Sequence, residues 1–497
     1  MSYVLGIDLG TSAVKVLLVD QKGQVVKEST KEYPLYQDRP GYSEQNPEDW
    51  YEQTVEAIQE ITSQFENSNQ IEGLSFSGQM HGLVLLDDHN EVLRRAILWN
   101  DTRTTEQCRE IEQTLTREKL LTITKNVALE GFTLPKILWV QKYEPEIFKR
   151  AATFLLPKDY VRFRLTGKLN MDYSDAAGTL LLDVAKKEWS EEICDAFNID
   201  HNICPSLVES HENVGKLLPH VATELGLNSS TSVFAGGADN ACGAIGSGIL
   251  EDGKTLSSIG TSGVVLSYEK DSDKDFNGKV HYFNHGAENV YYTMGVTLAA
   301  GHSLSWFKNV FASTMDMDEL VKEVSKSPVG AKGLLFTPYL VGERTPHADA
   351  NIRSSFIGVS STHQLHDFTR AVIEGITFSL NESIHIFREQ GKVINEVVSI
   401  GGGAKSPEWL QIQADIFNAK VVKLNSEQGP GMGAAMLAAY GLGWFNSLKE
   451  CADVFLKVKE TYEPIEENVK QYEKLFNIYR EIYHSTKTLN DSLKEFR

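Results

Sequence analysis

One short pattern occurs twice in the chain and constrains its fold more than any other feature. Leu9-Gly10-Thr11-Ser12-Ala13-Val14 returns as Ile259-Gly260-Thr261-Ser262-Gly263-Val264, 250 residues later. Each copy lies between an apolar run and a β-branched run, which is typical of a turn between two strands. A chance match is one interpretation. The other is a duplicated domain whose two turns face each other across a cleft.

The length of the chain fits a duplication. With 497 residues it exceeds the 250–300 residues at which a single core usually stops growing, so two domains are expected. The glycine-rich segment 236–248 is the candidate boundary. We therefore predict a first domain over residues 1–245 and a second over 246–497. The charged segment after residue 463 is predicted to be a helix on the second domain.

The first 65 residues predict a strand meander followed by a helix. Runs at 3–7, 13–20 and 24–29 are strand-like and separated by turn residues. This order differs from the β–α–β unit of dinucleotide-binding proteins. Asn46 and Pro47 then mark a helix N-terminus, with Asn as cap and Pro in the first turn.

The charge of the chain limits its partners. It carries 68 acidic and 48 basic residues, a net charge of −20. Nucleic acids and anionic membranes are therefore not expected as partners, because they need basic surface. No segment resembles a membrane span, and the N-terminus does not resemble a signal peptide, so a cytoplasmic location is expected.

The two Gly-Thr-Ser turns are candidate phosphate sites. Consecutive exposed N–H groups in a turn attract anions, so two facing turns suit a polyphosphate. The candidate residues are Gly10, Thr11, Ser12, Gly260, Thr261 and Ser262. Asp8 precedes the first turn. It is either a simple turn cap or a group that orients Mg²⁺ on a nucleotide, since Mg²⁺ prefers one or two carboxylates plus phosphates.

A formal match to the P-loop pattern GxxxxGK[ST] occurs at residues 248–255. We interpret it as accidental, because a P-loop opens a helix whereas Thr255 leads into a strand-like run. A third glycine cluster, Gly401 to Ala404, follows a predicted strand at 396–400. It is either a plain loop or a place where a flat ligand approaches the backbone.

Asp239 is the only charged residue between Thr231 and Leu250. A carboxylate in such surroundings is a helix N-cap, a chemically used group with a shifted pKa, or both. Two further loops carry polar groups suited to hydroxyl recognition. One contains Gln79, Met80 and His81 between two glycines, and the other is Trp99-Asn100-Asp101. A lone histidine is more often structural, so these loops stay candidates.

Two longer segments resemble signatures of the FGGY carbohydrate kinase family. One is Gly131-Phe-Thr-Leu-Pro-Lys-Ile-Leu-Trp-Val140; the other is Phe356-Ile-Gly-Val359 followed by Asp367-Phe-Thr-Arg-Ala-Val-Ile-Glu374. The similarity extends over roughly residues 4–460. It implies an α/β fold of duplicated actin/Hsp70-like (ribonuclease H-like) ATPase domains with a central cleft. The first domain would bind a sugar and the second a nucleotide.

The resemblance also implies roles for individual residues. Asp239 matches the catalytic base, and Asp8 matches the acid beside the first phosphate loop, with a role in catalysis and in metal binding. Gln79, Met80, His81, Asp101 and Asn240 match substrate contacts. Gly402, Gly403 and Ala404 resemble the adenosine motif; the following Ser406-Pro407-Glu408 departs from an adenine-contacting asparagine found in glycerol kinases.

The activity implied by the resemblance is phosphorylation of a small sugar, with ATP and Mg²⁺ as cofactors. Gly78 to Gly82, Leu98 to Arg103 and Gly342 to His347 are similar to family members that act on D-xylulose. Gluconate, ribulose or glycerol are alternative substrates, and a non-metabolic actin/Hsp70-like ATPase is the alternative class. The expected partners are the sugar and ATP, and a homodimer is the assembly that the family suggests.

Overall fold

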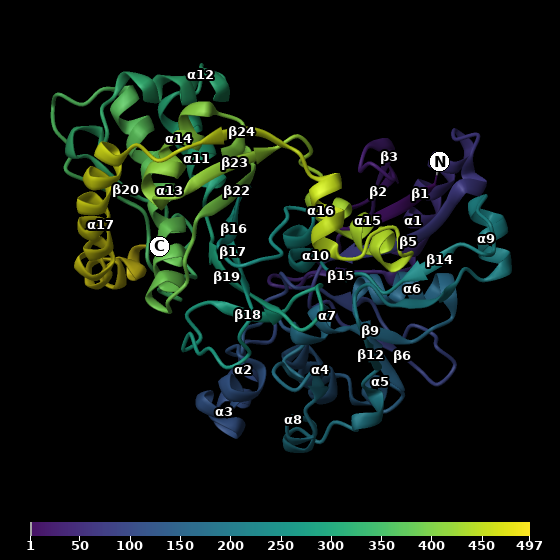
Figure 1. Cartoon of the computed structure of the whole chain (residues 1–497). Helices are drawn as coiled ribbons and strands as arrows, with labels where there is room; N and C mark the ends of the chain where they lie inside the picture. Colours follow the sequence, from purple (N-terminus) through teal and green to yellow (C-terminus); the bar gives the residue numbers. More distant parts are fainter. Residues whose placement is uncertain (1) are drawn as a thin grey trace.

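The computed structural model describes residues 2–497, which form two bodies that each contain a seven-stranded sheet (Figure 1). The first sheet has the order β13 (Asn213–Lys216), β14 (Ser232–Phe234), β5 (Ile71–Gly78), β1 (Tyr3–Leu9), β2 (Ala13–Asp20), β3 (Val25–Glu32), and β15 (Gly237–Ala238) pairs with β5. The second has the order β18 (His281–Asn284), β19 (Tyr291–Thr297), β17 (Gly263–Glu269), β16 (Lys254–Ile259), β22 (Glu396–Gly401), β23 (Lys420–Leu424), β24 (Val458–Tyr462).

The two sheets repeat one topology, which confirms the duplicated fold. In each sheet, a hairpin of two antiparallel strands carries a Gly-Thr-Ser turn, and its first strand pairs in parallel with a central strand. The first hairpin has one more loop residue than the second, because Leu9 pairs with Val14 whereas Ile259 pairs with Gly263. The first strand also runs beyond its predicted end at residue 7. Asp8 therefore lies inside β1, opposite Lys15, rather than after it.

Helices cover the two sheets and fill the long connection between β5 and β14. α1 (Pro47–Ser63) begins at the predicted Asn46 cap, whose side chain accepts the Glu48 N–H, and it packs on β2 and β3. The connection contains α2 (Thr105–Leu115), α3 (Arg117–Thr124), α4 (Thr133–Tyr143), α5 (Pro145–Phe148), α6 (Pro157–Thr166), α7 (Tyr173–Ala177), α8 (Glu191–Ala196) and α9 (Pro219–Leu225). α10 (Asp239–Ile245) follows β15 directly.

The second body has its own set of helices. They are α11 (Gly301–Phe311), α12 (Met317–Lys322), α13 (Leu365–Glu389), α14 (Pro407–Phe417) and α17 (Glu466–Ser492). α13 contacts β17 and β19, and α17 packs against α14, as expected for a helix on the second domain. Short strands complete the chain: β4 (Glu44–Gln45), β6 (Val84–Leu86), β7 (Ala96–Ile97), β8 (Thr153–Leu155), β9 (Asn170–Asp172), β10 (Leu182–Asp183), β11 (Glu188–Trp189), β12 (Ser206–Val208), β20 (Leu335–Thr337) and β21 (Ser355–Ile357).

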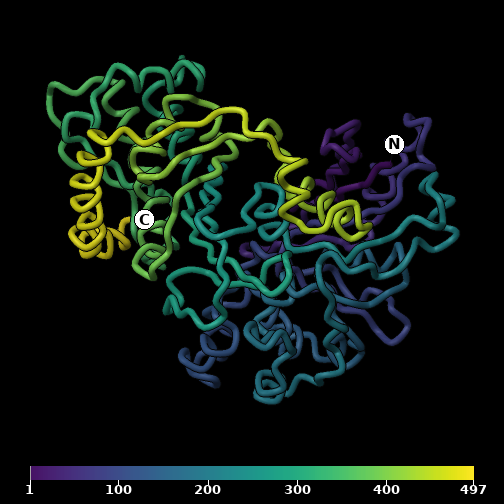
Figure 2. The backbone as a smooth tube through the Cα atoms, viewed as in Figure 1, coloured from purple at the N-terminus to yellow at the C-terminus, as the bar shows by residue number. Residues whose placement is uncertain are grey.

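Two helices from the second half of the chain pack on the first sheet. α15 (Gly429–Gly441) lies against β1, β5 and α10, and α16 (Leu448–Phe455) packs on α15. Glycines permit this close approach, since a Cβ on Gly6 would lie 2.2 Å from the Gly431 carbonyl oxygen. The chain then returns to the second body through β24 and α17 (Figure 2). The segment 429–455 thus ties the two bodies together.

Within residues 2–497, every helix is too short or too polar to span a lipid bilayer.

Candidate active site

The first Gly-Thr-Ser turn, residues 10–12, is held by side chains of its own body. The Tyr33 hydroxyl donates to the Gly10 carbonyl, and Gln45 Nε2 donates to the Thr11 carbonyl at 2.7 Å. Trp99 Nε1 donates to Thr11 Oγ1 at 2.9 Å. The backbone N–H groups of Thr11 and Ser12 make no hydrogen bond with residues 2–497. They are therefore free to bind an anion, as the sequence predicts.

The second turn, residues 260–262, is held by the start of α11. The Gly301 N–H donates to the Gly260 carbonyl at 2.8 Å, and the His302 N–H donates to the Thr261 carbonyl at 3.1 Å. All three turn residues are exposed, and the N–H groups of Thr261 and Ser262 make no hydrogen bond within the described chain. The helix N-terminus adds positive potential beside this turn.

Two carboxylates lie close together in the first body. Asp8 is half-buried in β1, and burial raises its pKa to about 6 while the charge of Lys15 offsets part of the rise. Asp239 is half-buried as the first residue of α10. Burial and the negative charge of Asp8 raise the pKa of Asp239 to about 7. A carboxyl group with a pKa near neutrality is suited to general base catalysis.

The structure corrects the interpretation of Asp239 as a helix cap. The N-cap of α10 is Ala238, which has no side chain able to cap. Asp239 Oδ1 instead accepts the backbone N–H of Asn240 at 2.7 Å and its Nδ2–H at 3.0 Å. Its second oxygen, Oδ2, makes no hydrogen bond within residues 2–497 and can receive a proton.

The loop after β5 carries Met80 and His81, and it places Met80 beside Asn240, the residue that follows Asp239. Asn240 Nδ2 approaches Met80 Sδ at 3.5 Å, so Met80 and Asn240 are neighbours. His81 has φ 70°, a left-handed conformation that costs free energy in a non-glycine residue. Its carbonyl is held in that conformation by Thr133 Oγ1 and Lys136 Nζ, each at 3.1 Å.

The tautomer of His81 follows from its partner. Nδ1 lies 2.6 Å from the Gly178 carbonyl, which can only accept, so Nδ1 carries the hydrogen. Burial, together with the charge of Lys136, lowers the pKa of His81 to about 3. The ring is therefore neutral near pH 7, and Nε2 keeps a lone pair that can accept a hydrogen bond from a hydroxyl.

Two of the predicted substrate-binding residues, Gln79 and Asp101, make hydrogen bonds to other groups of the protein. Gln79 is 1% exposed, and its Nε2 donates to Gln45 Oε1 at 3.0 Å, so it supports the residue that holds the first turn. Asp101 is also 1% exposed. Its Oδ2 accepts the Ser43 N–H and Arg103 NH2–H, each at 2.6 Å. These contacts give Gln79 and Asp101 a part in shaping the loops of the site.

Two residues of the second body act on the loop that carries Met80 and His81, and neither was named as a candidate from the sequence. The Tyr292 hydroxyl lies 4.0 Å from Met80 Sδ, and burial and the charge of Asp239 hold its pKa well above the usual range. Arg344 is exposed, and its guanidinium makes no hydrogen bond or ion pair within residues 2–497. Burial is the main cause of the lowered pKa of His81 and of His281, and the positive charge of Arg344 lowers both further. The segment Gly342 to His347, which the sequence analysis singled out, could have pointed to Arg344. No motif in the sequence pointed to Tyr292.

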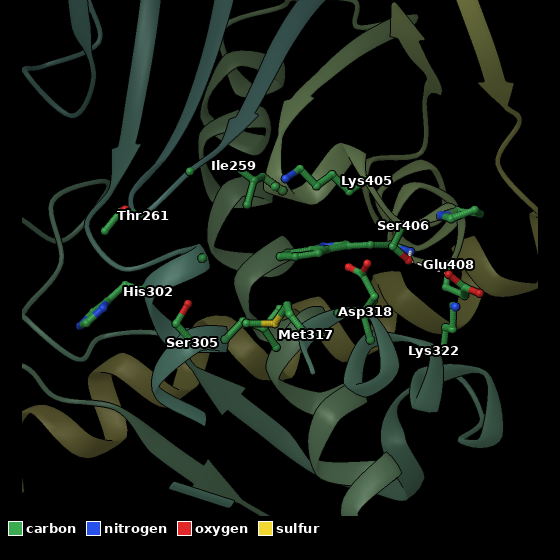
Figure 3. Close-up of a pocket in the computed structure, with 17 residues that line it drawn as sticks. Ile259, Thr261, His302, Ser305, Met317, Asp318, Lys322, Lys405, Ser406 and Glu408 are labelled. Atoms are coloured by element: carbon green, nitrogen blue, oxygen red, sulfur yellow. Dashed lines mark hydrogen bonds between the residues drawn. The ribbon is translucent and has the colours of Figure 1, made fainter. Parts of the chain in front are cut away.

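A pocket of about 540 Å³ adjoins the second turn (Figure 3). Thr261 and His302 lie at one end, and Lys322 and Glu408 lie at the other. The lining comes from the second turn, the start of α11, both ends of α12, and the segment from Gly402 into the start of α14: Ile259, Gly260, Thr261, Gly301, His302, Leu304, Ser305, Met317, Asp318, Val321, Lys322, Gly402, Lys405, Ser406, Pro407, Glu408 and Trp409. Its volume, and its position next to the free N–H groups of the second turn, suit a nucleoside whose phosphates point toward Thr261.

Of the predicted adenosine motif, only one residue lines this pocket. Gly402 is exposed in it, whereas Gly403 and Ala404 are buried behind it. A Cβ on Gly403 would lie 2.5 Å from Ile259 Cδ1, so Gly403 serves packing against β16. Ser406 lines the pocket as well, and its hydroxyl donates to Glu408 at 2.6 Å.

Comparisons with known proteins agree with this geometry. Residues 3–246 match the model for the N-terminal domain of the FGGY family of carbohydrate kinases, and residues 255–442 match the C-terminal domain model. A xylulose kinase from Bacillus subtilis is 61% identical over 498 residues, covering 100% of both chains. A ligand-bound xylulose kinase from Lactobacillus acidophilus superposes with a TM-score of 0.94 at 28% identity, over 99% of this chain and 100% of that one. A gluconate kinase from the same organism superposes with a TM-score of 0.94 at 28% sequence identity, over 100% of both chains.

Proposed function

Because the chain belongs to the FGGY family of carbohydrate kinases, we propose that it transfers the γ-phosphoryl group of ATP to D-xylulose, which yields D-xylulose 5-phosphate and ADP. The observation that carries the proposal is the surroundings of Asp239. Its carboxyl group has a pKa of about 7 and lies beside Asn240 and, through it, Met80. The full-length relative named xylulose kinase supports the choice of substrate.

In the proposed reaction, Asp239 accepts the proton of the terminal sugar hydroxyl. The hydroxyl oxygen attacks the γ-phosphorus in line, the bond to the β,γ-bridging oxygen breaks, and ADP leaves. Such a transfer requires alignment and charge neutralisation rather than covalent catalysis. The free N–H groups of the two turns are available to neutralise charge on the phosphates. The pocket next to Thr261 would hold the adenosine.

The donor set in the first body also fits Mg²⁺. Asp8 provides a carboxylate one residue before the end of β1, close to a turn with free N–H groups, and the charge of Lys15 acts on it. A hard divalent ion prefers such an oxygen ligand together with phosphate oxygens. When bound, Mg²⁺ would neutralise charge on the β- and γ-phosphates. Asp8 would orient the ion, which explains why a half-buried acid is placed here.

The sugar would be held by the loop that carries Met80 and His81. Nε2 of the neutral His81 would accept a hydrogen bond from one sugar hydroxyl, and Asn240 Oδ1 would accept one from another, because Asn240 Nδ2 is engaged by Asp239 and Met80. We assign sugar binding to residues 1–245 and nucleotide binding to 246–497, with 429–455 as the connection between them. Closure of the two bodies over the ligands would exclude water and limit ATP hydrolysis without sugar.

The test is a coupled assay of ADP release across D-xylulose, L-ribulose, D-gluconate and glycerol. We expect kcat/KM for D-xylulose to exceed the others by at least about tenfold, a difference of about 1.4 kcal/mol in transition-state binding. A higher value for gluconate would replace the substrate within the same family. ATP turnover that does not respond to any of the four would contradict a sugar kinase and favour an ATPase of another kind.

A further inference from the structure

A buried ionic cluster lies behind the loop that carries Met80 and His81, where a Cβ on Gly78 would lie 2.7 Å from Lys158 Cβ. The carboxylates of Asp159, Asp172 and Asp175 surround the ammonium group of Lys158, with Nζ–O distances of 2.7, 2.7 and 2.8 Å. All four side chains are fully buried. The ammonium group occupies the position at the centre of the three acids, so the cluster is an ion-pair network.

Asp172 connects this cluster to the residue before Asp239. It is the N-cap of α7, and its Oδ2 accepts the Ser174 N–H at 2.9 Å and the hydroxyl hydrogens of Ser174 and Ser210. Because the Ser174 hydroxyl gives its hydrogen to Asp172, its oxygen is free to accept. It accepts the Ala238 N–H at 2.9 Å. Ala238 is the N-cap of α10, so this bond fixes the backbone from which Asp239 projects.

The other end of α7 contacts the sugar loop. Gly178, which caps the C-terminus of α7, accepts the hydrogen bond from His81 Nδ1. A Cβ on Gly178 would lie 2.9 Å from His81 Nδ1 and 2.9 Å from Met80 Cε. The short helix α7 thus contacts the backbone of Ala238, the residue before Asp239, at its start, and it contacts the His81 ring at its end.

We propose that α7 is the positioning element of the active site. Ser174, held by Asp172, sets the position of Asp239 through Ala238, and Gly178 sets the orientation and tautomer of His81. Ser174 and Asp172 are fully buried and act only through these neighbours. The proposal rests on the proposed function, in which Asp239 is the base. Lys158 and its acids provide α7 with a rigid support.

The chain offers a matched pair of serines for the test. Ser174 and Ser210 both donate to Asp172 Oδ2, but only the Ser174 hydroxyl also accepts the Ala238 N–H. We expect Ser174→Ala to lower kcat by about tenfold or more, since small misplacements of reacting groups have large effects. KM for ATP should not change. Ser210→Ala should keep kcat within about twofold, because it loses the shared contact alone.

A double-mutant cycle separates this inference from the assignment of the base. If Ser174 acts through Asp239, Ser174→Ala should cause little further loss in an Asp239→Asn background. An equal fold-loss in both backgrounds would overturn the positioning role. Normal turnover of Asp239→Asn alone would instead overturn the proposed base, whatever Ser174→Ala does.

Ser174→Thr keeps the hydroxyl group and is the rescue variant, expected to retain most of kcat. If Ser174→Ala does not fold, as judged by circular dichroism and ATP binding, Ser174→Cys takes its place, because a thiol is similar in size but a weak acceptor. Equal kcat losses in the Ser174 and Ser210 variants, or a Ser174 variant with wild-type kcat, would contradict the proposal.

Discussion

The two Gly-Thr-Ser turns occupy the same position in two similar sheets, yet they are held in different ways. The first is held mainly by side chains, because Tyr33, Gln45 and Trp99 bond to its carbonyls and hydroxyl; one backbone bond, from the Tyr33 N–H to the Ser12 carbonyl at 3.2 Å, adds to them. Backbone holds the second, through the N–H groups of Gly301 and His302. The first turn therefore depends largely on three particular side chains, whereas the second depends on a close approach that glycine permits.

The strands before the turns differ in charge as well. Asp8 in β1 and Ser258 in β16 occupy matching positions, each one residue before the last residue of its strand. The carboxylates next to the turns, Asp8 and Asp239, thus belong to the first body. The second body has the nucleotide-sized pocket. In the proposed function, the first copy of the scaffold would provide the acid–base and metal-binding groups, and the second copy would provide the binding volume.

The largest expected effect is that of Asp239→Asn, which removes the only proposed base. We expect kcat to fall by about 10²–10⁴. The variant should fold and bind both ligands, because Asn can still accept the Asn240 N–H and the N-cap of α10 is Ala238. Steady-state kinetics and a thermal midpoint measure this. A variant with more than about a tenth of wild-type kcat would exclude Asp239 as the base.

The sequence contained the local part of this site and lacked the long-range part. The strand at 13–20 was predicted with its observed bounds, because alternating apolar residues and turns are local signals. The two hydrogen bonds that α7 makes to the site join residue pairs separated by 64 and by 97 positions in the sequence, and no local pattern encodes them. The crossing of α15 onto the first sheet was missed for the same reason.

The next effect tests the difference in charge between the two strands. Asp8→Asn should lower kcat about 10–100-fold and raise the Mg²⁺ concentration needed for half-maximal rate, because the proposed ligand loses its charge. Ser258→Ala is the matched control at the equivalent position and should change both by less than about threefold. A Mg²⁺ titration of the two variants measures this. Equal effects would mean that the two strands have equivalent roles.

His81→Ala tests the assignment of sugar binding to the first body. Loss of a hydrogen bond to a buried hydroxyl costs about 1–2 kcal/mol, so KM for D-xylulose should rise roughly 5–30-fold. KM for ATP should stay within about twofold, because His81 bonds to Gly178 and packs on Phe132, far in sequence from the second turn. Unchanged sugar kinetics would remove His81 from the site.

Gly301→Ala tests the backbone support of the second turn. Its Cβ would lie 2.5 Å from the Gly260 carbonyl oxygen, so the turn and α11 must separate. We expect KM for ATP to rise about three- to tenfold while KM for D-xylulose changes little. Tyr33→Phe is the counterpart in the first turn, where the loss of one hydrogen bond should cost about 1 kcal/mol. If Gly301→Ala raised only the sugar KM, the division between the two bodies would be wrong.

The smallest expected effect is that of Lys254→Ala, which tests whether any other segment binds phosphate. The structure confirms that the P-loop pattern at 248–255 does not open a helix: Lys254 and Thr255 begin β16, and Lys254 pairs with Glu251 at 3.1 Å. A P-loop lysine contacts the β- and γ-phosphates, and its loss would be severe. Lys254 lies at the opposite end of β16 from the second turn. ATP affinity and kcat should therefore stay within about twofold, and loss of the partly exposed ion pair should cost at most about 1 kcal/mol of folding stability. Loss of nucleotide binding in this variant would mean that the two turns do not form the phosphate site.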